Sequence, residues 1–190
     1  MNFSDEFQVR EVSDEESLRR ICRLRAEVWT GSGALLPDSW RDELDEGARH
    51  WAVWDASGQL VAAARLTLHE SLNTLCEAEE YLRYAELLTP LEGRIAAPDR
   101  VVVAPFARNR GLADCLLELQ EQAAQAEGAR LAVRQASPAM CRLLVRRGWQ
   151  LLGPATSDPR FPQTRFTVAA KTLAAPATIA ISSIAGGPRE

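Results

Sequence analysis

The sequence predicts a domain of the mixed α/β (α+β) class, in which strands and helices follow one another along the chain. Two observations lead to this expectation. Apolar residues alternate along some segments, as in strands, and recur every three or four positions along others, as in helices. The 190 residues are also enough for one sizeable core. We expect a single domain over residues 1–173 and an Ala/Pro/Ser-rich tail over residues 174–190.

The first half is expected to begin with a strand at residues 8–12 and a helix that ends at about residue 29. Ser13 and Glu16 form a capping box for this helix. A glycine-containing loop at residues 31–37 follows it.

Two antiparallel strands are expected next, at residues 49–54 and 59–68, with a turn between them. Arg65 is a lone charge among small apolar residues of the second strand, so it requires a partner or a solvated cleft. Residues 71–93 are expected to form a helix plus loops, with these residues on one apolar face: Ala78, Leu82, Ala85 and Leu88.

The second half shows apolar periodicity from Leu112 up to Gly128, which predicts a helix. A second helix is expected to begin with Ser137 as its cap and Pro138 as its first residue. Strands are expected at residues 131–134, 150–152 and 164–172. In the tail, residues 178–184 are an alternative edge strand, and the tail is a candidate contact in a homodimer.

Residues 101–113 predict a site for phosphate groups. Three valines form a strand that ends at Pro105, because proline cannot continue the hydrogen-bond ladder. The helix that follows begins with amides that have no partners within the helix and therefore attract anions. Gly111 permits close approach of the backbone, and Arg108 and Arg110 supply donors suited to phosphate. We predict a pyrophosphate site; the alternative is an ordinary turn with its arginines in solvent.

The same segment resembles the acyl-CoA-binding signature of the GNAT acyltransferase superfamily. That signature runs Val-x-Pro and then Arg/Gln-x-x-Gly-x-Gly/Ala, and residues 103–113 match it at each of these positions. The order of the expected elements over residues 8–172 is also similar to that of the superfamily. The resemblance implies a central mixed, mostly antiparallel twisted sheet flanked by helices. It also implies an N-acyltransferase with acetyl-CoA or another acyl-CoA as cosubstrate and no metal.

The resemblance implies a set of residues that contact acyl-CoA: Val101, Val103, Arg108, Asn109, Arg110, Gly111, Leu112, Ala113 and Ser137. It further implies that a bulged, splayed fourth strand offers backbone amides to the acyl carbonyl at about residues 101–103. One departure concerns Leu144, which stands where many members have a tyrosine that protonates the leaving thiolate. The CoA thiol is acidic enough that this loss does not exclude catalysis.

The N-terminal half resembles one branch of the superfamily, the acyl-homoserine-lactone synthases and N-acyl amino acid synthases. Their pattern is Arg-x-x-x-aromatic, Asp-x-x-Asp, Arg-Leu and Glu-x-x-Arg, in that order. The resemblance implies substrate-binding roles for the matching residues: Arg25, Trp29, Asp42, Asp45, Arg65 and Arg100. The two aspartates either hold an amino substrate or form a structural ion cluster with the arginines. The glutamate that serves as base in this branch is Ala97 here.

An amine that attacks a thioester needs only modest help from a base, so a carboxylate acting through water is sufficient. Asp99 is the first candidate, with Glu92 and Asp45 behind it. The alternative is that Asp99 is an exposed loop acid. Trp29 and Trp40 are candidates to line an acyl or substrate pocket.

Composition excludes several classes of function. The chain has 22 basic and 26 acidic residues, which argues against a general nucleic-acid surface. A group of arginines suits one phosphate-bearing ligand: Arg108, Arg110, Arg130, Arg134, Arg142, Arg146 and Arg147. The four cysteines lie far apart in the sequence, which argues against a disulfide framework or a metal site. We expect them to be small buried residues of a protein in a reducing compartment. No segment suggests a signal peptide or a membrane span, so we expect a cytoplasmic protein.

The preferred function is transfer of an acetyl group from acetyl-CoA to the amine of a small molecule or amino acid derivative, by direct attack in a ternary complex. An alternative within the class is a synthase that takes a longer acyl chain from CoA or from acyl carrier protein. That alternative predicts a tunnel beside the fourth and fifth strands. An alternative from another class is a non-catalytic acyl-CoA-binding module.

Overall fold

Residues 6–88 and 93–174 are described by a computed structural model of the chain. The strands are β1 (Phe7–Val12), β2 (Arg49–Asp55), β3 (Leu60–His69), β4 (Arg94–Val103), β5 (Ala129–Ala136), β6 (Gln150–Pro154) and β7 (Thr167–Thr172). The α-helices are α1 (Glu15–Thr30), α2 (Ala78–Leu82), α3 (Leu112–Ala126) and α4 (Pro138–Arg146). Short 3₁₀ turns are η1 (Glu43–Asp45), η2 (Leu72–Thr74), η3 (Ala85–Leu87) and η4 (Pro105–Ala107). This order of strands and helices confirms the expected order.

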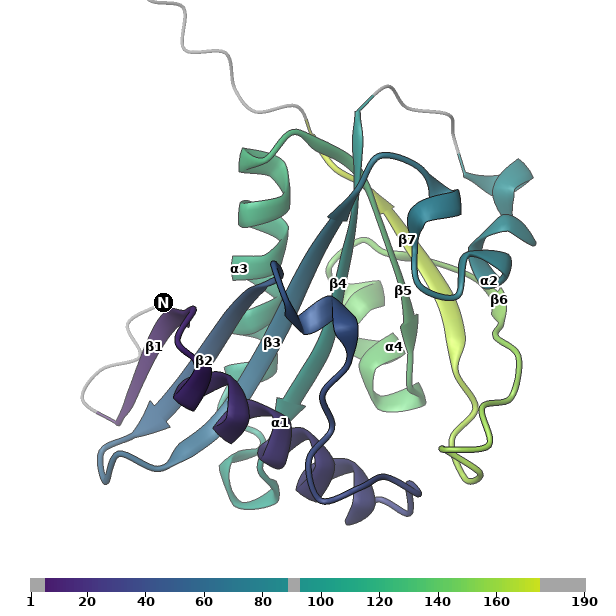
Figure 1. Cartoon of the computed structure of the whole chain (residues 1–190). Coiled ribbons are helices and arrows are strands. Elements are labelled where there is room, and N and C mark those ends of the chain that lie inside the picture. The colour runs from purple at the N-terminus through teal and green to yellow at the C-terminus, as the bar shows by residue number, and fades with distance from the viewer. Residues whose placement is uncertain (1–5, 89–92, 175–190) are drawn as a thin grey trace, which may run out of the picture.

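The described strands form one seven-stranded sheet in the order β1-β2-β3-β4-β5-β7-β6. All neighbours pair antiparallel except β4 and β5, which run parallel. Helices α1 and α2 lie on the face toward the viewer in Figure 1, and α3 and α4 lie behind the sheet. The mixed, mostly antiparallel sheet flanked by helices is therefore confirmed.

The middle of the sheet carries most of the core. Strand β3 is almost entirely buried, because its small residues allow α1 to pack on one face and α3 on the other. From α1, Ile21 and Leu24 reach this core, and from α3, Leu116 and Leu117 do. Each helix therefore turns one apolar face toward the sheet.

Strand β4 is bulged and splits from β5. Opposite β3, the register runs from Ala63↔Val102 to Arg65↔Asp99, so β4 has one residue more than its partner in this stretch. On the other side, β4 pairs with β5 only over Arg94 to Ala96. Beyond Ala96 the two parallel strands separate, as the family resemblance implied. The split opens space between two strands at the centre of the sheet.

Several local predictions need correction. Helix α1 begins one residue later than expected, because Asp14 rather than Ser13 is its cap and accepts a hydrogen bond from the Ser17 amide at 2.8 Å. Strand β4 begins at Arg94 and includes Pro98, since the long strand β3 pairs with it along this length. Strand β7 begins at Thr167 instead of residue 164.

The segment between β3 and β4 also differs from expectation. Of the expected apolar face, Leu88 is buried as predicted, but Leu82 is 41% exposed. Tyr81, which was not assigned to this face, is buried instead. Short turns around the five-residue helix α2 break the periodicity that a longer helix would have. Cys22 and Cys141 are buried as expected, whereas Cys76 is exposed and Cys115 is only partly buried, so the expectation of buried cysteines is wrong for these two. The alternative edge strand at residues 178–184 and the candidate base Glu92 lie outside the described residues.

No helix within residues 6–88 and 93–174 has the length and apolarity needed to cross a membrane.

Candidate active site

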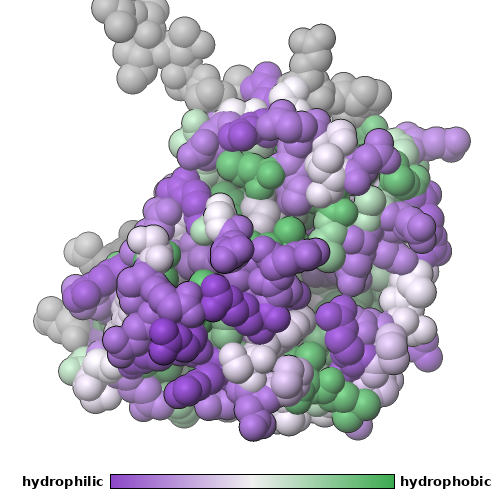
Figure 2. Space-filling model, viewed as in Figure 1, coloured by the Kyte–Doolittle hydropathy of each residue, from purple (hydrophilic) through white to green (hydrophobic). Residues whose placement is uncertain are grey.

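Two cavities are lined by residues at the split between β4 and β5. The first, of about 670 Å³, adjoins the loop between β4 and α3 and is called the cradle cavity. The second, of about 250 Å³, is lined from β3, β4, β5, η1 and α2 and is called the inner cavity. Figure 2 shows that polar and charged side chains cover most of the face above the sheet, with apolar side chains exposed between them.

The cradle cavity brings together most of the predicted acyl-CoA contacts. These residues line it: Val101, Val103, Arg108, Asn109, Gly111, Leu112, Ala113 and Ser137. Gly111 is the cap residue of α3 and has a left-handed φ of 77°. No side chain accepts a hydrogen bond at this cap, so the first amides of α3 are left for a ligand.

Arg110 is the exception among the predicted contacts. It does not line the cradle cavity, since its guanidinium pairs with Glu6 at 3.1 Å and lies over the Phe7 ring of β1. Arg108 and Arg146 are the members of the arginine group that do line this cavity. The expectation that the whole group serves one phosphate ligand is therefore wrong, because the chain turns these side chains to different neighbours.

The two cavities share four lining residues, namely Trp29, Val101, Ser137 and Met140. Ser137 caps α4, as predicted, by accepting a hydrogen bond from the Met140 amide at 3.4 Å. Trp29 closes the opposite side and packs on Phe161 with 5.1 Å between ring centroids. The cavities therefore meet where β4 is bulged.

A cluster of ion pairs forms the wall of the inner cavity toward α1. Arg25 and Asp45 pair at 2.6 Å with both side chains fully buried. Arg65, also buried, pairs with Asp45 at 3.1 Å and with Asp42. Its guanidinium also holds both oxygens of Asp99, at 2.9 and 2.6 Å. The lone charge at position 65 thus has the partners that the sequence required.

The edge of this cluster faces the cavity. Arg100 donates to Asp42 at 2.5 Å and lies 3.5 Å from the centroid of the Trp40 ring. Its φ of 53° belongs to the bulge in β4. Of the predicted substrate contacts, Arg25 and Asp45 do not line the inner cavity. The inner cavity is lined by the remaining predicted residues and by Trp40: Trp29, Asp42, Arg65, Asp99 and Arg100. The cluster is therefore a structural core with one face toward the cavity.

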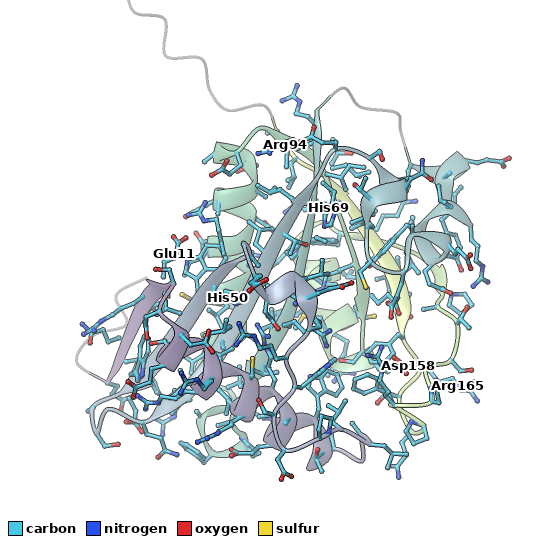
Figure 3. All side chains as sticks on the ribbon, viewed as in Figure 1. Glu11, His50, His69, Arg94, Asp158 and Arg165 are labelled. Atoms are coloured by element: carbon cyan, nitrogen blue, oxygen red, sulfur yellow. The ribbon has the colours of Figure 1, made fainter. Side chains whose placement is uncertain are left out.

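Burial and charge act against each other on the carboxylates. Burial raises the pKa of Asp45, but the positive charge and hydrogen bond of Arg25 outweigh it and lower the pKa overall. Burial lowers the pKa of His50, which is labelled in Figure 3 and contacts this pair. The neutral ring fits its contacts, since one nitrogen is 3.1 Å from the Asp45 carbonyl and the other 3.3 Å from Arg25.

Acid is expected to destabilise the fold. The pKa values of Asp42, Asp45 and Glu121 are lowered, because ion pairs outweigh the effect of burial. The folded state therefore binds these protons less tightly than the unfolded state. The stabilisation is present above the ordinary carboxyl pKa, about 4, and is lost as the pH falls through the lowered values. Thermal unfolding from about pH 6 to about pH 3 should show a falling midpoint, and a constant midpoint would contradict this.

The candidate base Asp99 belongs to β4, where it pairs with Arg65 of β3, so the alternative of an exposed loop acid is wrong. Its side chain is 32% exposed and lines the inner cavity. Asp45, the other candidate, is fully buried and lines neither cavity. Ala97 lines the inner cavity, while Leu144 is fully buried in the core.

Some residues of the inner cavity were not assigned to it from the sequence: Glu77, Tyr81, Arg134, Arg160 and Phe161. Arg134 had a detectable signal, since it is a charge at the end of a short apolar strand, like Arg65 in its own strand. Glu77 had no such signal in the sequence. It is placed by the turn before α2, where its backbone has a left-handed φ of 59°. The non-glycine residues with positive φ in the described chain are Glu77, Arg100 and Asn109, and each lines one of the cavities.

A model of the acetyltransferase (GNAT) family matches residues 15–149. The chain belongs to this family. It is therefore an acyltransferase, and the alternative of a non-catalytic binding module is set aside. No curated protein sequence matches the chain.

Solved structures of the same fold include both kinds of synthase that the sequence resembles. FeeM, an N-acyl amino acid synthase from uncultured soil microbes, superposes with a TM-score of 0.68 at 12% identity over 90% of this chain and 92% of its own. The acyl-homoserine-lactone synthase LasI gives 0.66 at 15% identity, again over 90% and 92%. An acyl-CoA N-acyltransferase from Pseudomonas aeruginosa gives 0.61 at 19% identity over 87% and 99%. At these identities the likeness concerns the fold.

Proposed function

We propose that this protein transfers an acyl group from acyl-CoA to the amine of a small molecule or amino acid derivative, with acetyl as the preferred acyl group. The observation that carries the proposal is the meeting of the two cavities at Val101, Ser137 and Met140. A donor in one cavity and an acceptor in the other would bring thioester and amine together at the bulge of β4. Such an arrangement supports direct attack in a ternary complex, because it holds both reactants in one geometry.

The cradle cavity suits the donor. The start of α3 offers free amides and the positive end of the helix dipole, and Arg108 adds a guanidinium. Arg146 at the end of α4 lines the same cavity and supplies a second guanidinium. Phosphate groups of CoA match these donors, and the pantetheine arm would then extend along β4 toward the junction.

The junction suits the chemistry of acyl transfer. Beyond Ala96, β4 no longer pairs with β5, so the bulged segment offers amides that can polarise the acyl carbonyl. The amine loses its proton to Asp99 through a water molecule, since Asp99 lines the inner cavity. The neutral nitrogen then attacks the thioester carbon, and the carbon–sulfur bond breaks. The CoA thiolate leaves and takes up the proton that the nitrogen loses as the amide forms.

Donor binding is tested with two arginines that lie two residues apart. Arg108→Ala should raise the Kd for acetyl-CoA about tenfold, because one charge-assisted contact to phosphate is lost. Arg110→Ala should leave the Kd unchanged, since Arg110 pairs with Glu6 instead. Isothermal titration of acetyl-CoA into the three proteins measures both effects.

Release of CoA thiol with a panel of amines then tests the transfer. Binding that the Arg108 variant loses, together with thiol release in the parent protein, supports the proposal. Absence of acyl-CoA binding, or equal loss in both variants, would overturn the assigned donor site.

A second candidate is transfer of a longer acyl chain, from CoA or from acyl carrier protein. Apolar side chains on the far side of the split favour it, since Leu75, Tyr81 and Val133 line the inner cavity. A series of acyl-CoA donors from two to about twelve carbons distinguishes the candidates, because each buried methylene contributes about 0.8 kcal/mol. A kcat/KM that rises with chain length favours the longer donor, and one that falls after acetyl favours the first proposal.

A further inference from the structure

Arg134 of β5 has no counter-ion among the described residues. The residue is 5% exposed and lines the inner cavity. Its Nε and Nη1 atoms are buried without a hydrogen-bond partner. Burial lowers the pKa of this arginine, which reflects how poorly its charge is solvated. A buried guanidinium without a partner is unfavourable, so proteins retain one where a ligand supplies the negative charge.

The other arginines of the inner cavity differ in this respect. Each of them pairs with a carboxylate: Arg65 with Asp99 at 2.6 Å, Arg100 with Asp42 at 2.5 Å and Arg160 with Asp158 at 2.6 Å. Arg134 is therefore the arginine of this cavity that can offer its planar fork to a ligand. Such a fork matches the two oxygens of a carboxylate.

The charges around the cavity indicate what kind of anion fits. The lining contains five acidic side chains, Asp42, Glu43, Glu77, Asp99 and Asp158, against four arginines. This balance disfavours a dianion such as a phosphate monoester and suits a ligand that carries one carboxylate and one amine. The phosphates of the donor already have their own site in the cradle cavity, on the other side of β4.

We propose that Arg134 binds the carboxylate of the acceptor, and that the acceptor is therefore an amino acid or another amine with a carboxylate group. This inference rests on the proposed function and names its substrate class. The carboxylate lies against β5 at Arg134, and the amine points toward Asp99 of β4, where the thioester enters. Strands β4 and β5 thus hold the two ends of one small molecule across the split.

The test compares each free amino acid with its carboxamide, which keeps the amine and the side chain but has no negative charge. The panel is the common amino acids and their amides, with acetyl-CoA as donor, and thiol release is measured. At least one free acid should exceed its amide by about 10- to 100-fold in kcat/KM, the range expected for a charge-assisted contact. Thermal shift with the same pairs, in the presence of CoA, provides a readout that does not depend on turnover.

Two variants of β5 complete the test. Arg134→Met should abolish the preference for acids over amides and leave the midpoint of thermal unfolding unchanged or higher, because an unpaired buried charge is removed. Arg130→Met is the matched control, since Arg130 lies on the same strand but lines neither cavity, and its preference should equal that of the parent protein.

The outcomes separate this inference from the proposed function. Equal use of acids and amides, or a preference that survives in Arg134→Met, would overturn the role of Arg134 while acyl transfer stands. No shift and no turnover with any acid or amide, while acetyl-CoA still binds, would also overturn it. A loss of stability in Arg134→Met would assign the arginine to the core instead of to a ligand.

Discussion

Asp45→Asn is expected to lower the free energy of unfolding by about 3–5 kcal/mol, the loss typical of a broken buried ion pair. Asp45 lies between two buried guanidiniums, with Arg25 at 2.6 Å and Arg65 at 3.1 Å. An amide in its place keeps the shape of the side chain but removes the charge. Arg25 is then left with no carboxylate, in a site where its side chain is fully buried. Urea denaturation measures the change, and the folded baseline should stay intact.

Glu15→Gln is the control for this experiment. Glu15 also pairs with two arginines, Arg19 at 3.3 Å and Arg41 at 2.6 Å, but about half of its side chain is exposed. Water solvates both charges there, so the variant should be indistinguishable from the parent protein. If Asp45→Asn and Glu15→Gln had the same small effect, the cluster would be open to solvent in solution, contrary to its burial here.

Met140→Trp is expected to reduce acyl transfer about 100-fold while acyl-CoA still binds. Met140 lines both cavities at their junction and is partly exposed on the first turn of α4. An indole in this place fills the junction and holds the reacting carbon away from the amine. Displacement by about 1 Å is sufficient for a loss of this size. Single-turnover kinetics measures transfer, and titration with CoA measures binding.

Met140→Leu is the matched variant at this position. It conserves volume and should keep transfer close to the parent rate. Transfer that is unchanged in Met140→Trp would show that the reactants meet elsewhere. Loss of both CoA binding and transfer would point to a distorted α4, and circular dichroism of the two variants would detect that distortion.

Local signals in the sequence predicted much of the fold. Ser137 and Pro138 start α4 as expected, and Gly128 follows the end of α3 with a left-handed φ of 79°. Such signals depend on the backbone of a few neighbouring residues, so they can be recognised one segment at a time. Boundaries were less accurate where a partner strand decides them. Strand β4 extends back to Arg94 because β3 and β5 offer it hydrogen bonds there.

The candidate site was predicted only in part, because its local segments can be recognised in the sequence but contacts between distant segments cannot. Apart from Ser137, the predicted acyl-CoA contacts lie within residues 101–113, and apart from Arg110 the structure places all of them around the cradle cavity. The direction of the Arg110 side chain could not be predicted, because its partners are Phe7 at the start of β1 and Glu6 just before it, far away in the sequence. The pairing of Arg65 with Asp99 likewise depends on the register between β3 and β4.

The sequence by itself determined the family, the order of elements and the start of α3 after Gly111, because each of these depends on residue types at fixed spacing along the chain. Only the tertiary structure decided which charges are neutralised and which are free. Arg65 and Arg134 look alike in sequence, as single charges in apolar strands, yet one meets three carboxylates and the other meets none among the described residues. Charge pairing depends on distances between segments far apart in the chain, and those distances exist only once the strands are assembled.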